Sequence, residues 1–173
     1  MEASGFVSFR VQFRFRIFSP NLNAFKMASR RIEDLDPVLA YAFGKAEGEW
    51  KIKFAAFAQP FITCTYRPPA EQTTLFNQPT DKKDNDGDGK IDEADERVTN
   101  ARAGQSAHNF LPALAFDIAF RNPNGSLDWD PDIFKAFSNL VMKTPGIVWG
   151  GSFKSIKDAP HFERSGWELL AKK

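Results

Sequence analysis

The sequence predicts a single α+β domain, with a small antiparallel sheet and helices packed on one of its faces. Short strand-like runs and helix-like segments are mixed without the regular βαβ repeat of a parallel sheet. The length of 173 residues suits one hydrophobic core, and 42% of the residues are hydrophobic. We expect the domain to span residues 29–165, between a basic extension at 1–28 and a C-terminal tail at 166–173.

Residues 6–18 alternate between apolar and polar side chains, which is typical of a strand with one arginine-rich face. The first 31 residues carry six Lys or Arg against one Glu, a net charge of +5. Three interpretations are open: an edge strand, a cationic arm that binds anionic surfaces, and an extension upstream of a true start at Met27. Arginines interrupt the apolar run that a secretory signal would need.

Two Asp-Pro pairs predict helix starts, because aspartate caps a first turn and proline fits its first position. The first predicted helix follows Asp36 to about residue 47, with a continuation through Trp50 and the run 54–57 as the alternative. The other predicted helices occupy 70–76 and follow Asp130 to about residue 142. Period-two apolar runs and turn residues predict strands at 61–66, 98–100, 113–120, 147–149 and 161–163.

The composition excludes several classes of protein. The single cysteine, Cys64, rules out an internal disulfide, and its apolar surroundings favour a packed thiol over a nucleophile. The formal net charge of +1 gives no argument for nucleic-acid binding. No stretch is apolar and long enough to cross a membrane. We expect a monomer.

The chain has two histidines, and each lies in a phrase typical of metal ligands. His108 precedes Asp117, which lies in the clearest core strand, and His161 lies in the last predicted strand. Two imidazoles and one carboxylate would supply the three protein ligands of a catalytic zinc ion and leave a fourth position for water. The alternative is a pair of unrelated histidines, one of them a satisfied core residue.

Two further residues could provide the rest of a hydrolytic mechanism. Asp158 precedes His161 across a turn at Pro160, where it is well placed to act as a general base. Arg67 follows the strand 61–66 and could stabilise an oxyanion or hold a substrate carboxylate.

Together these phrases resemble the zinc D,D-/L,D-peptidases of peptidoglycan. This family includes D-alanyl-D-alanine carboxypeptidases and the L-alanyl-D-glutamate endopeptidases of phage endolysins, and it shares the fold of the Hedgehog signalling domain. The resemblance covers about residues 29–165. The segments that carry it are Thr65-Tyr66-Arg67, Gly104–Asn109, Ala115–Asp117, Asp128–Asp130, Trp149–Gly151 and Asp158–Glu163.

The resemblance implies that His108, Asp117 and His161 bind zinc. It also implies that Asp158 acts as the base and that Arg67 assists the transition state. The substrate would be the stem peptide of bacterial peptidoglycan.

Three more residues are implied as substrate-binding or supporting groups: Ser106, Trp149 and Glu163. Glu163 would orient His161 or Arg67 from the side that faces away from the zinc ion. The chain departs from the family pattern at two points. The gap between the first histidine and the aspartate is two residues longer than the usual form, and Ser152 stands where an acidic residue often follows the two glycines.

Residues 84–95 fit the spacing of a calcium loop of EF-hand type, inserted between the arginine and the first histidine. The predicted ligands are Asp84, Asp86, Asp88, the Lys90 carbonyl, Asp92 and Asp95. Asp instead of Glu at the last position predicts modest affinity, and the alternative is a solvated acidic loop. We hypothesise that calcium orders this loop and steadies one wall of the active site.

The sequence therefore predicts a zinc peptidase of the peptidoglycan stem. An endolysin-type L-alanyl-D-glutamate endopeptidase, held in the host cytoplasm until release to the cell wall, ranks above a D-alanyl-D-alanine carboxypeptidase. The alternative from another class is a non-catalytic, calcium-stabilised wall-binding module.

Overall fold

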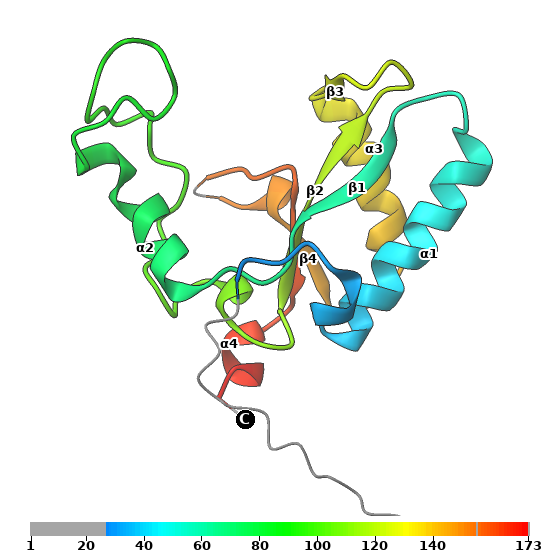
Figure 1. The fold of residues 1–173 in the computed structure, drawn as a ribbon. Helices are drawn as coiled ribbons and strands as arrows, with labels where there is room; N and C mark the ends of the chain where they lie inside the picture. The colour runs from blue at the N-terminus through cyan, green and yellow to red at the C-terminus, as the bar shows by residue number, and fades with distance from the viewer. Residues whose placement is uncertain (1–26, 155, 173) are drawn as a thin grey trace, which may run out of the picture.

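The computed structural model describes residues 27–154 and 156–172, so the alternating segment 6–18 lies outside the described residues. Four helices and five strands follow one another along this part of the chain (Figure 1). Their order is α1 (Pro37–Lys53), β1 (Gln59–Cys64), α2 (Pro69–Asn77), β2 (Ala115–Arg121), β3 (Leu127–Asp128), α3 (Pro131–Val141), β4 (Ile147–Trp149), β5 (His161–Arg164) and α4 (Trp167–Leu170).

The strands form one antiparallel sheet in the order β1-β2-β5-β4, and the short β3 pairs with β2. Helices α1 and α3 lie together on one side of this sheet, whereas α2 and the acidic loop extend away on the other side (Figure 1). The predicted α+β class, with helices packed on one face of an antiparallel sheet, is confirmed.

Strand β2 divides the domain into a core face and an open face. Phe116, Ile118 and Phe120 are at most 1% exposed and pack in the core with residues of α1 and α3. Phe116 also stacks on Phe162 of β5, with ring centroids 5.0 Å apart. Because side chains alternate along a strand, Asp117 points to the opposite face.

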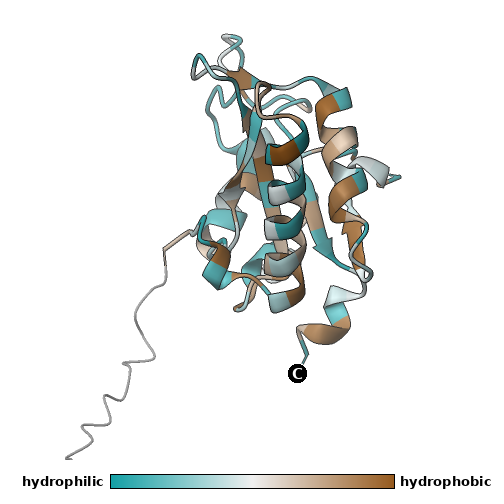
Figure 2. Cartoon of the chain, turned by 90° about the vertical axis from the view of Figure 1, so that its right-hand side faces the viewer, coloured by the Kyte–Doolittle hydropathy of each residue, from teal (hydrophilic) through white to brown (hydrophobic). Residues whose placement is uncertain are grey.

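Both predicted aspartate caps are present. Asp36 accepts a hydrogen bond from the Val38 N–H at 3.0 Å, and Asp130 accepts one from the Asp132 N–H at 2.9 Å. Helix α1 ends at Lys53, so it follows the longer alternative past Trp50 but does not include the run 54–57. Figure 2, turned toward this side of the molecule, shows hydrophobic and hydrophilic bands on the helices that face the viewer. Within the described part of the chain, no helix has the length and apolar character of a membrane span.

Three sequence predictions differ from the structure. Residues 98–100, all described, form an irregular segment and no strand, and the Thr99 hydroxyl accepts a hydrogen bond from the Gln72 side chain of α2. Strand β3 was not predicted, since two residues carry no periodicity. The segment 166–173, expected to be a tail, contains α4, and Trp167 packs against the cluster of Ala107, Leu114 and Ala115.

Gly150 allows the end of β4 to approach the turn that precedes β5. A Cβ atom at this position would lie 2.5 Å from the carbonyl oxygen of Asp158 and 2.9 Å from Cβ of His161. Neither contact involves the far end of a flexible side chain, so the backbone would have to move. The close approach therefore requires glycine.

We predict that Gly150→Ala lowers the free energy of unfolding by about 1–3 kcal/mol through overpacking. Gly44→Ala is the matched control, because Gly44 lies in α1 with no atom within 4 Å of the added methyl group. The control should gain about 0.5–1 kcal/mol from helix propensity. Chemical denaturation of both variants measures the difference, and equal effects would contradict this account of the turn.

Candidate active site

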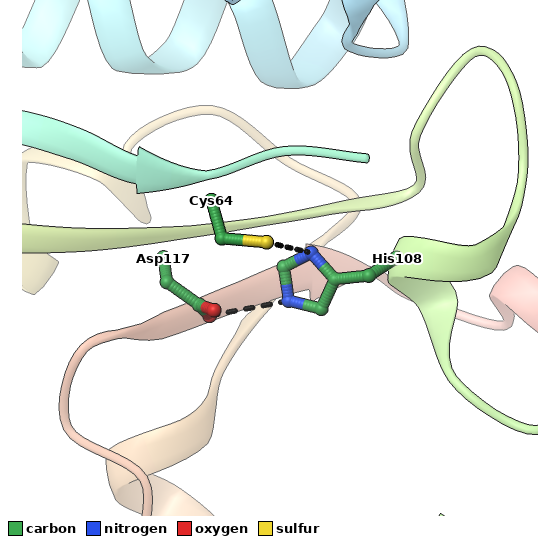
Figure 3. Close-up of side chains that lie close together, drawn as sticks. All are labelled: Cys64, His108 and Asp117. Atoms are coloured by element: carbon green, nitrogen blue, oxygen red, sulfur yellow. Dashed lines mark hydrogen bonds and ion pairs between the residues drawn. The ribbon is translucent and has the colours of Figure 1, made fainter. Parts of the chain in front are cut away.

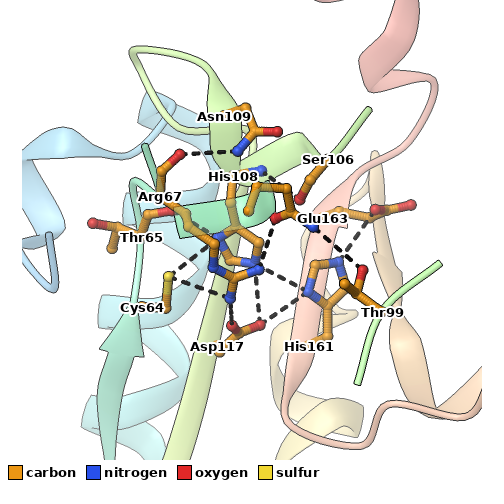
Figure 4. Close-up of polar contacts among 11 residues, drawn as sticks. Cys64, Thr65, Arg67, Thr99, Ser106, His108, Asn109, Asp117, His161 and Glu163 are labelled. Atoms are coloured by element: carbon orange, nitrogen blue, oxygen red, sulfur yellow. Dashed lines mark hydrogen bonds and ion pairs between the residues drawn. The ribbon is translucent and has the colours of Figure 1, made fainter. Parts of the chain in front are cut away.

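Three side chains from separate elements converge on one point (Figure 4). His108 lies in a 3-10 turn (Ala107–Asn109), Asp117 in β2 and His161 in β5. Oδ1 of Asp117 lies 3.2 Å from Nε2 of His108 and 2.9 Å from Nδ1 of His161, and these two nitrogens are 3.3 Å apart. Donor atoms around a tetrahedral zinc ion lie about 3.3 Å from one another. The donor set and its spacing therefore fit a zinc ion.

The sheet register places two of these groups side by side. Asp117 of β2 is the direct partner of His161 in β5, and its other neighbour across the sheet is Cys64 of β1. His108 comes from outside the sheet and is fixed by its backbone, because its carbonyl accepts a hydrogen bond from the Arg67 N–H at 2.9 Å. The loop between the 3-10 turn and β2 accommodates the longer gap noted in the sequence.

The second ring nitrogen of each histidine also has a partner. Nδ1 of His108 lies 2.7 Å from the Thr65 carbonyl oxygen, and Nε2 of His161 lies 3.2 Å from Oε2 of Glu163. These contacts fix ring orientation and direct the opposite nitrogens to the shared point. Of the two partners expected for Glu163, the structure places it against His161.

Burial and mutual attraction shift the pKa values of the three groups in the metal-free protein. Burial lowers the pKa of His108, but the Asp117 carboxylate outweighs it and raises the value to about 10. Burial likewise opposes protonation of His161, and hydrogen bonds to Asp117 and Glu163 raise its pKa to about 9. Burial would raise the pKa of Asp117, but the two imidazoles hold it well below its ordinary value. The cluster is thus a carboxylate that stabilises protonated imidazole.

Asp158 and Arg67, predicted as catalytic groups, both lie at this centre. A carboxylate oxygen of Asp158 is within 4.8 Å of donor atoms of Asp117 and His161. Burial raises the pKa of Asp158, and the negative charge of Asp117 raises it further. Nη2 of Arg67 donates to Oδ2 of Asp117 at 3.2 Å. The structure therefore brings a carboxylate and a guanidinium to the shared point from different segments.

Cys64 lies closer to the site than its sequence setting indicates (Figure 3). Its Sγ atom is 3.7 Å from Nδ1 of His108 and 3.7 Å from Nη2 of Arg67. The thiol approaches the nitrogen of His108 that faces away from Asp117. Cys64 thus packs behind the three converging residues, which agrees with the predicted packed thiol, but no sequence pattern indicated this neighbourhood.

A cleft of about 450 Å³ opens over the three converging residues. Ser106 and Glu163 line it, as predicted, together with Asp158. Trp149 instead donates from Nε1 to the Ala159 carbonyl at 2.8 Å and so braces the turn that carries Asp158. Apolar wall residues that sequence reasoning missed are Leu75, Val98, Phe153, Ile156 and Trp167.

The acidic loop brings a different set of carboxylates together from the one predicted. Oxygens of Asp84, Asp86 and Glu96 lie within 4.8 Å of one another, and Glu96 is only 2% exposed. Asp95, predicted as the last ligand, is exposed. Asp88 forms an ion pair with Lys90, at 2.8 Å from its Nζ atom.

Asp92, another of the predicted ligands, accepts a hydrogen bond from the Lys82 N–H at 2.7 Å. Asp84 accepts hydrogen bonds from the N–H groups of Gly87 and Gly89. Both glycines have positive φ angles, which side-chain-bearing residues rarely adopt.

Comparison with known proteins gives matches in sequence and in structure. A family model described as D-alanyl-D-alanine carboxypeptidase matches residues 99–164. The peptidoglycan L-alanyl-D-glutamate endopeptidase CwlK of Bacillus subtilis (strain 168) is 36% identical over 111 residues, which are 59% of this chain and 58% of CwlK. The chain thus matches somewhat more than half of the length of this relative.

Two solved structures have the same fold. The L-Ala D-Glu endopeptidase ChiX of Serratia marcescens aligns with a TM-score of 0.54 and 17% identity, covering 88% of this chain and 98% of ChiX. A mutant of the vancomycin-resistance D,D-pentapeptidase VanY in complex with Zn(II) aligns with a TM-score of 0.55 and 14% identity, covering 86% and 84%. These matches confirm the resemblance predicted from the motifs: residues 99–164 are similar to the D-alanyl-D-alanine carboxypeptidase family, and 111 residues of the chain are similar to CwlK.

Proposed function

We propose that this protein is a zinc-dependent peptidase that hydrolyses a peptide bond in the peptidoglycan stem, as an L-alanyl-D-glutamate endopeptidase. The observation that carries the proposal is the convergence of His108, Asp117 and His161, with donor atoms 2.9–3.3 Å apart at the floor of a cleft. These three residues would hold the zinc ion. When bound, zinc supplies a Lewis acid that makes hydroxide available near neutral pH.

Asp158 is proposed as the general base. Its position beside the shared point allows it to accept a proton from water and return it to the leaving amine. A pKa raised by burial and by Asp117 brings its proton affinity closer to that needed near neutral pH. Arg67 is proposed to stabilise negative charge that develops on the carbonyl oxygen of the scissile bond.

A second cavity of about 420 Å³ shares Arg67, Asp117 and Leu75 with the main cleft. We propose that this additional space receives part of a substrate that continues beyond the cleaved bond, which favours an endopeptidase over a carboxypeptidase. CwlK and ChiX, both named as endopeptidases of L-alanyl-D-glutamate bonds, support the same choice.

We also propose that the loop 84–96 binds calcium. Asp84, Asp86 and the buried Glu96 offer oxygen atoms close together, which suits a hard cation. Glu96 would take the place predicted for Asp95. Because residues 98–101 follow this loop directly and line the cleft, a bound ion would steady one wall of the active site.

An endolysin is the biological setting that we propose, with the enzyme held in the host cytoplasm until a pore opens the path to the wall. Expression in host cells with and without a pore-forming protein tests this setting. Lysis that requires the pore supports it, and lysis without any pore contradicts it.

We predict that zinc binding displaces protons and tightens as the pH rises. The pKa values of about 10 for His108 and about 9 for His161 mean that the metal-free site holds protons at neutral pH. Zinc requires neutral imidazole, so affinity should rise up to about tenfold per pH unit for each proton displaced. Calorimetry in buffers of different ionisation enthalpy measures the proton release, and pH-independent affinity would contradict the site.

The same shifts predict how the stability of the metal-free protein depends on pH. Both histidines bind protons more tightly in the folded chain than at their ordinary pKa of 6.5. Their contribution to stability is therefore complete below about pH 6.5 and is lost as the pH rises through 9 to 10. The difference in melting temperature between chelator-treated and zinc-loaded protein should therefore grow as the pH rises.

We predict that the unmodified protein frees the amino group of D-glutamate from purified peptidoglycan, whereas a carboxypeptidase would free terminal D-alanine. Asp158→Asn should lower kcat by about 10²–10⁴-fold, because the amide cannot accept the proton. Zinc content, measured by mass spectrometry, should be unchanged. Wall binding by the unmodified protein without any release of amino groups would favour the non-catalytic module.

We predict that calcium raises the melting temperature of protein from which metal ions have been removed by chelation and dialysis and to which zinc has then been returned. Binding to the folded state alone adds about 2.7 kcal/mol at a calcium concentration 100 times Kd. Asp84→Asn should abolish the shift, while Asp132→Asn, in α3, should retain it. An unchanged melting temperature in millimolar calcium would refute binding, and unchanged wall hydrolysis in calcium-free, zinc-replete buffer would refute the proposed effect on activity.

A further inference from the structure

Gln72 of α2 is a buried amide with no exposed surface, and it lies between Arg67 and the segment that follows the acidic loop. Its Oε1 atom accepts a hydrogen bond from Nη1 of Arg67 at 3.1 Å. Its Nε2 atom donates to the Ala101 carbonyl at 2.8 Å and to Oγ1 of Thr99 at 3.3 Å. Because arginine only donates and a carbonyl only accepts, one orientation of the amide satisfies all three partners.

On one side, Gln72 supports the arginine. The Arg67 guanidinium has two oxygen partners on different elements, Oδ2 of Asp117 on β2 (Figure 4) and Oε1 of Gln72 on α2. Its side chain is 15% exposed. A free arginine side chain loses rotamer entropy when it is ordered. The two anchors order it before any substrate arrives.

On the other side, Gln72 holds a wall of the cleft that has no regular secondary structure. Residues 98–101 line the cleft, and within the described chain they belong to no helix or strand. The hydrogen bonds from Gln72 to Thr99 and Ala101 tie this wall to α2. A further bond from the Ala101 N–H to Oγ1 of Thr99, at 3.1 Å, closes the turn.

We propose that Gln72 is a positioning residue: it fixes the Arg67 guanidinium and the wall 98–101 relative to each other and acts in the reaction through Arg67. This inference rests on the proposed peptidase function. It predicts that the effect of Gln72 on kcat depends on the guanidinium, whereas a purely structural role would act equally in any background.

A double-mutant cycle in the full-length, zinc-loaded protein tests the proposal. Gln72→Met removes both ends of the amide and should lower kcat about 10- to 100-fold on a soluble stem peptide, the scale expected for a displaced catalytic group. In an Arg67→Lys background the same change should lower kcat less than threefold. An equal fold-loss of kcat for Gln72→Met in the two backgrounds would overturn the proposal.

Two variants control for folding. Gln72→Glu keeps an acceptor for Arg67 and should retain more kcat than Gln72→Met, while its lost N–H donors should raise KM by loosening the wall. Gln59→Met makes the same chemical change in an amide that bonds to the carbonyls of Phe54 and Phe57, away from the cleft. It should lower the melting temperature without changing kcat. A kcat loss for Gln59→Met as large as for Gln72→Met would mean that general destabilisation is the cause.

A readout independent of activity separates this inference from the proposed function. The ¹⁵N guanidinium resonance of Arg67, assigned by comparison with Arg67→Lys, should report a restrained side chain in the unmodified protein and a mobile one in Gln72→Met. The same relaxation in both proteins would overturn the inference. An inactive unmodified protein with a restrained Arg67 would refute the peptidase proposal and retain the role of Gln72 in holding the arginine.

Discussion

The register between β2 and β5 is the constraint on which the site depends. It places Asp117 directly beside His161, and the alternation of β2 places the neighbouring Phe116 in the core on the other face. A slip of one residue would exchange these two faces, burying the carboxylate and exposing the aromatic ring. The stacking of Phe116 on Phe162 stabilises the same register from the core side. Core packing and site geometry are therefore two consequences of one strand pairing.

Much of this arrangement was predictable because it follows from local patterns. The alternation of apolar residues indicated β2, the Asp-Pro pairs indicated the starts of α1 and α3, and rare histidines in recognisable phrases indicated the donor residues. Asp117 and His161 could be assigned to strands before any contact between them was known. His108 was less certain, since a longer loop precedes β2, and its place is fixed by a backbone hydrogen bond from Arg67 that no sequence pattern encodes.

The features that the sequence did not predict depend on tertiary contacts. Gln72 is satisfied by residues 99 and 101, which are distant in the chain and have no periodic signal of their own. Trp167 reaches the cleft because a short helix packs beside the residues around His108. In the acidic loop, the spacing of carboxylates suggested that Asp95 joins Asp84 and Asp86. The buried Glu96 lies beside them instead, and its oxygen accepts a hydrogen bond from the Asn85 N–H at 2.7 Å.

The Asp117 carboxylate links the two halves of the site, because its oxygens face different partners. Oδ1 faces both imidazoles, whereas Oδ2 accepts from Arg67. An arginine bound to the outer oxygen is kept close to the point where the donors converge, yet it does not occupy that point. Gln72 then connects this arginine to the wall that begins where the acidic loop ends. The hydrogen bonds of Gln72 therefore form a short connection between the segment that follows the acidic loop and the Arg67 guanidinium, and this connection does not pass through the three converging residues.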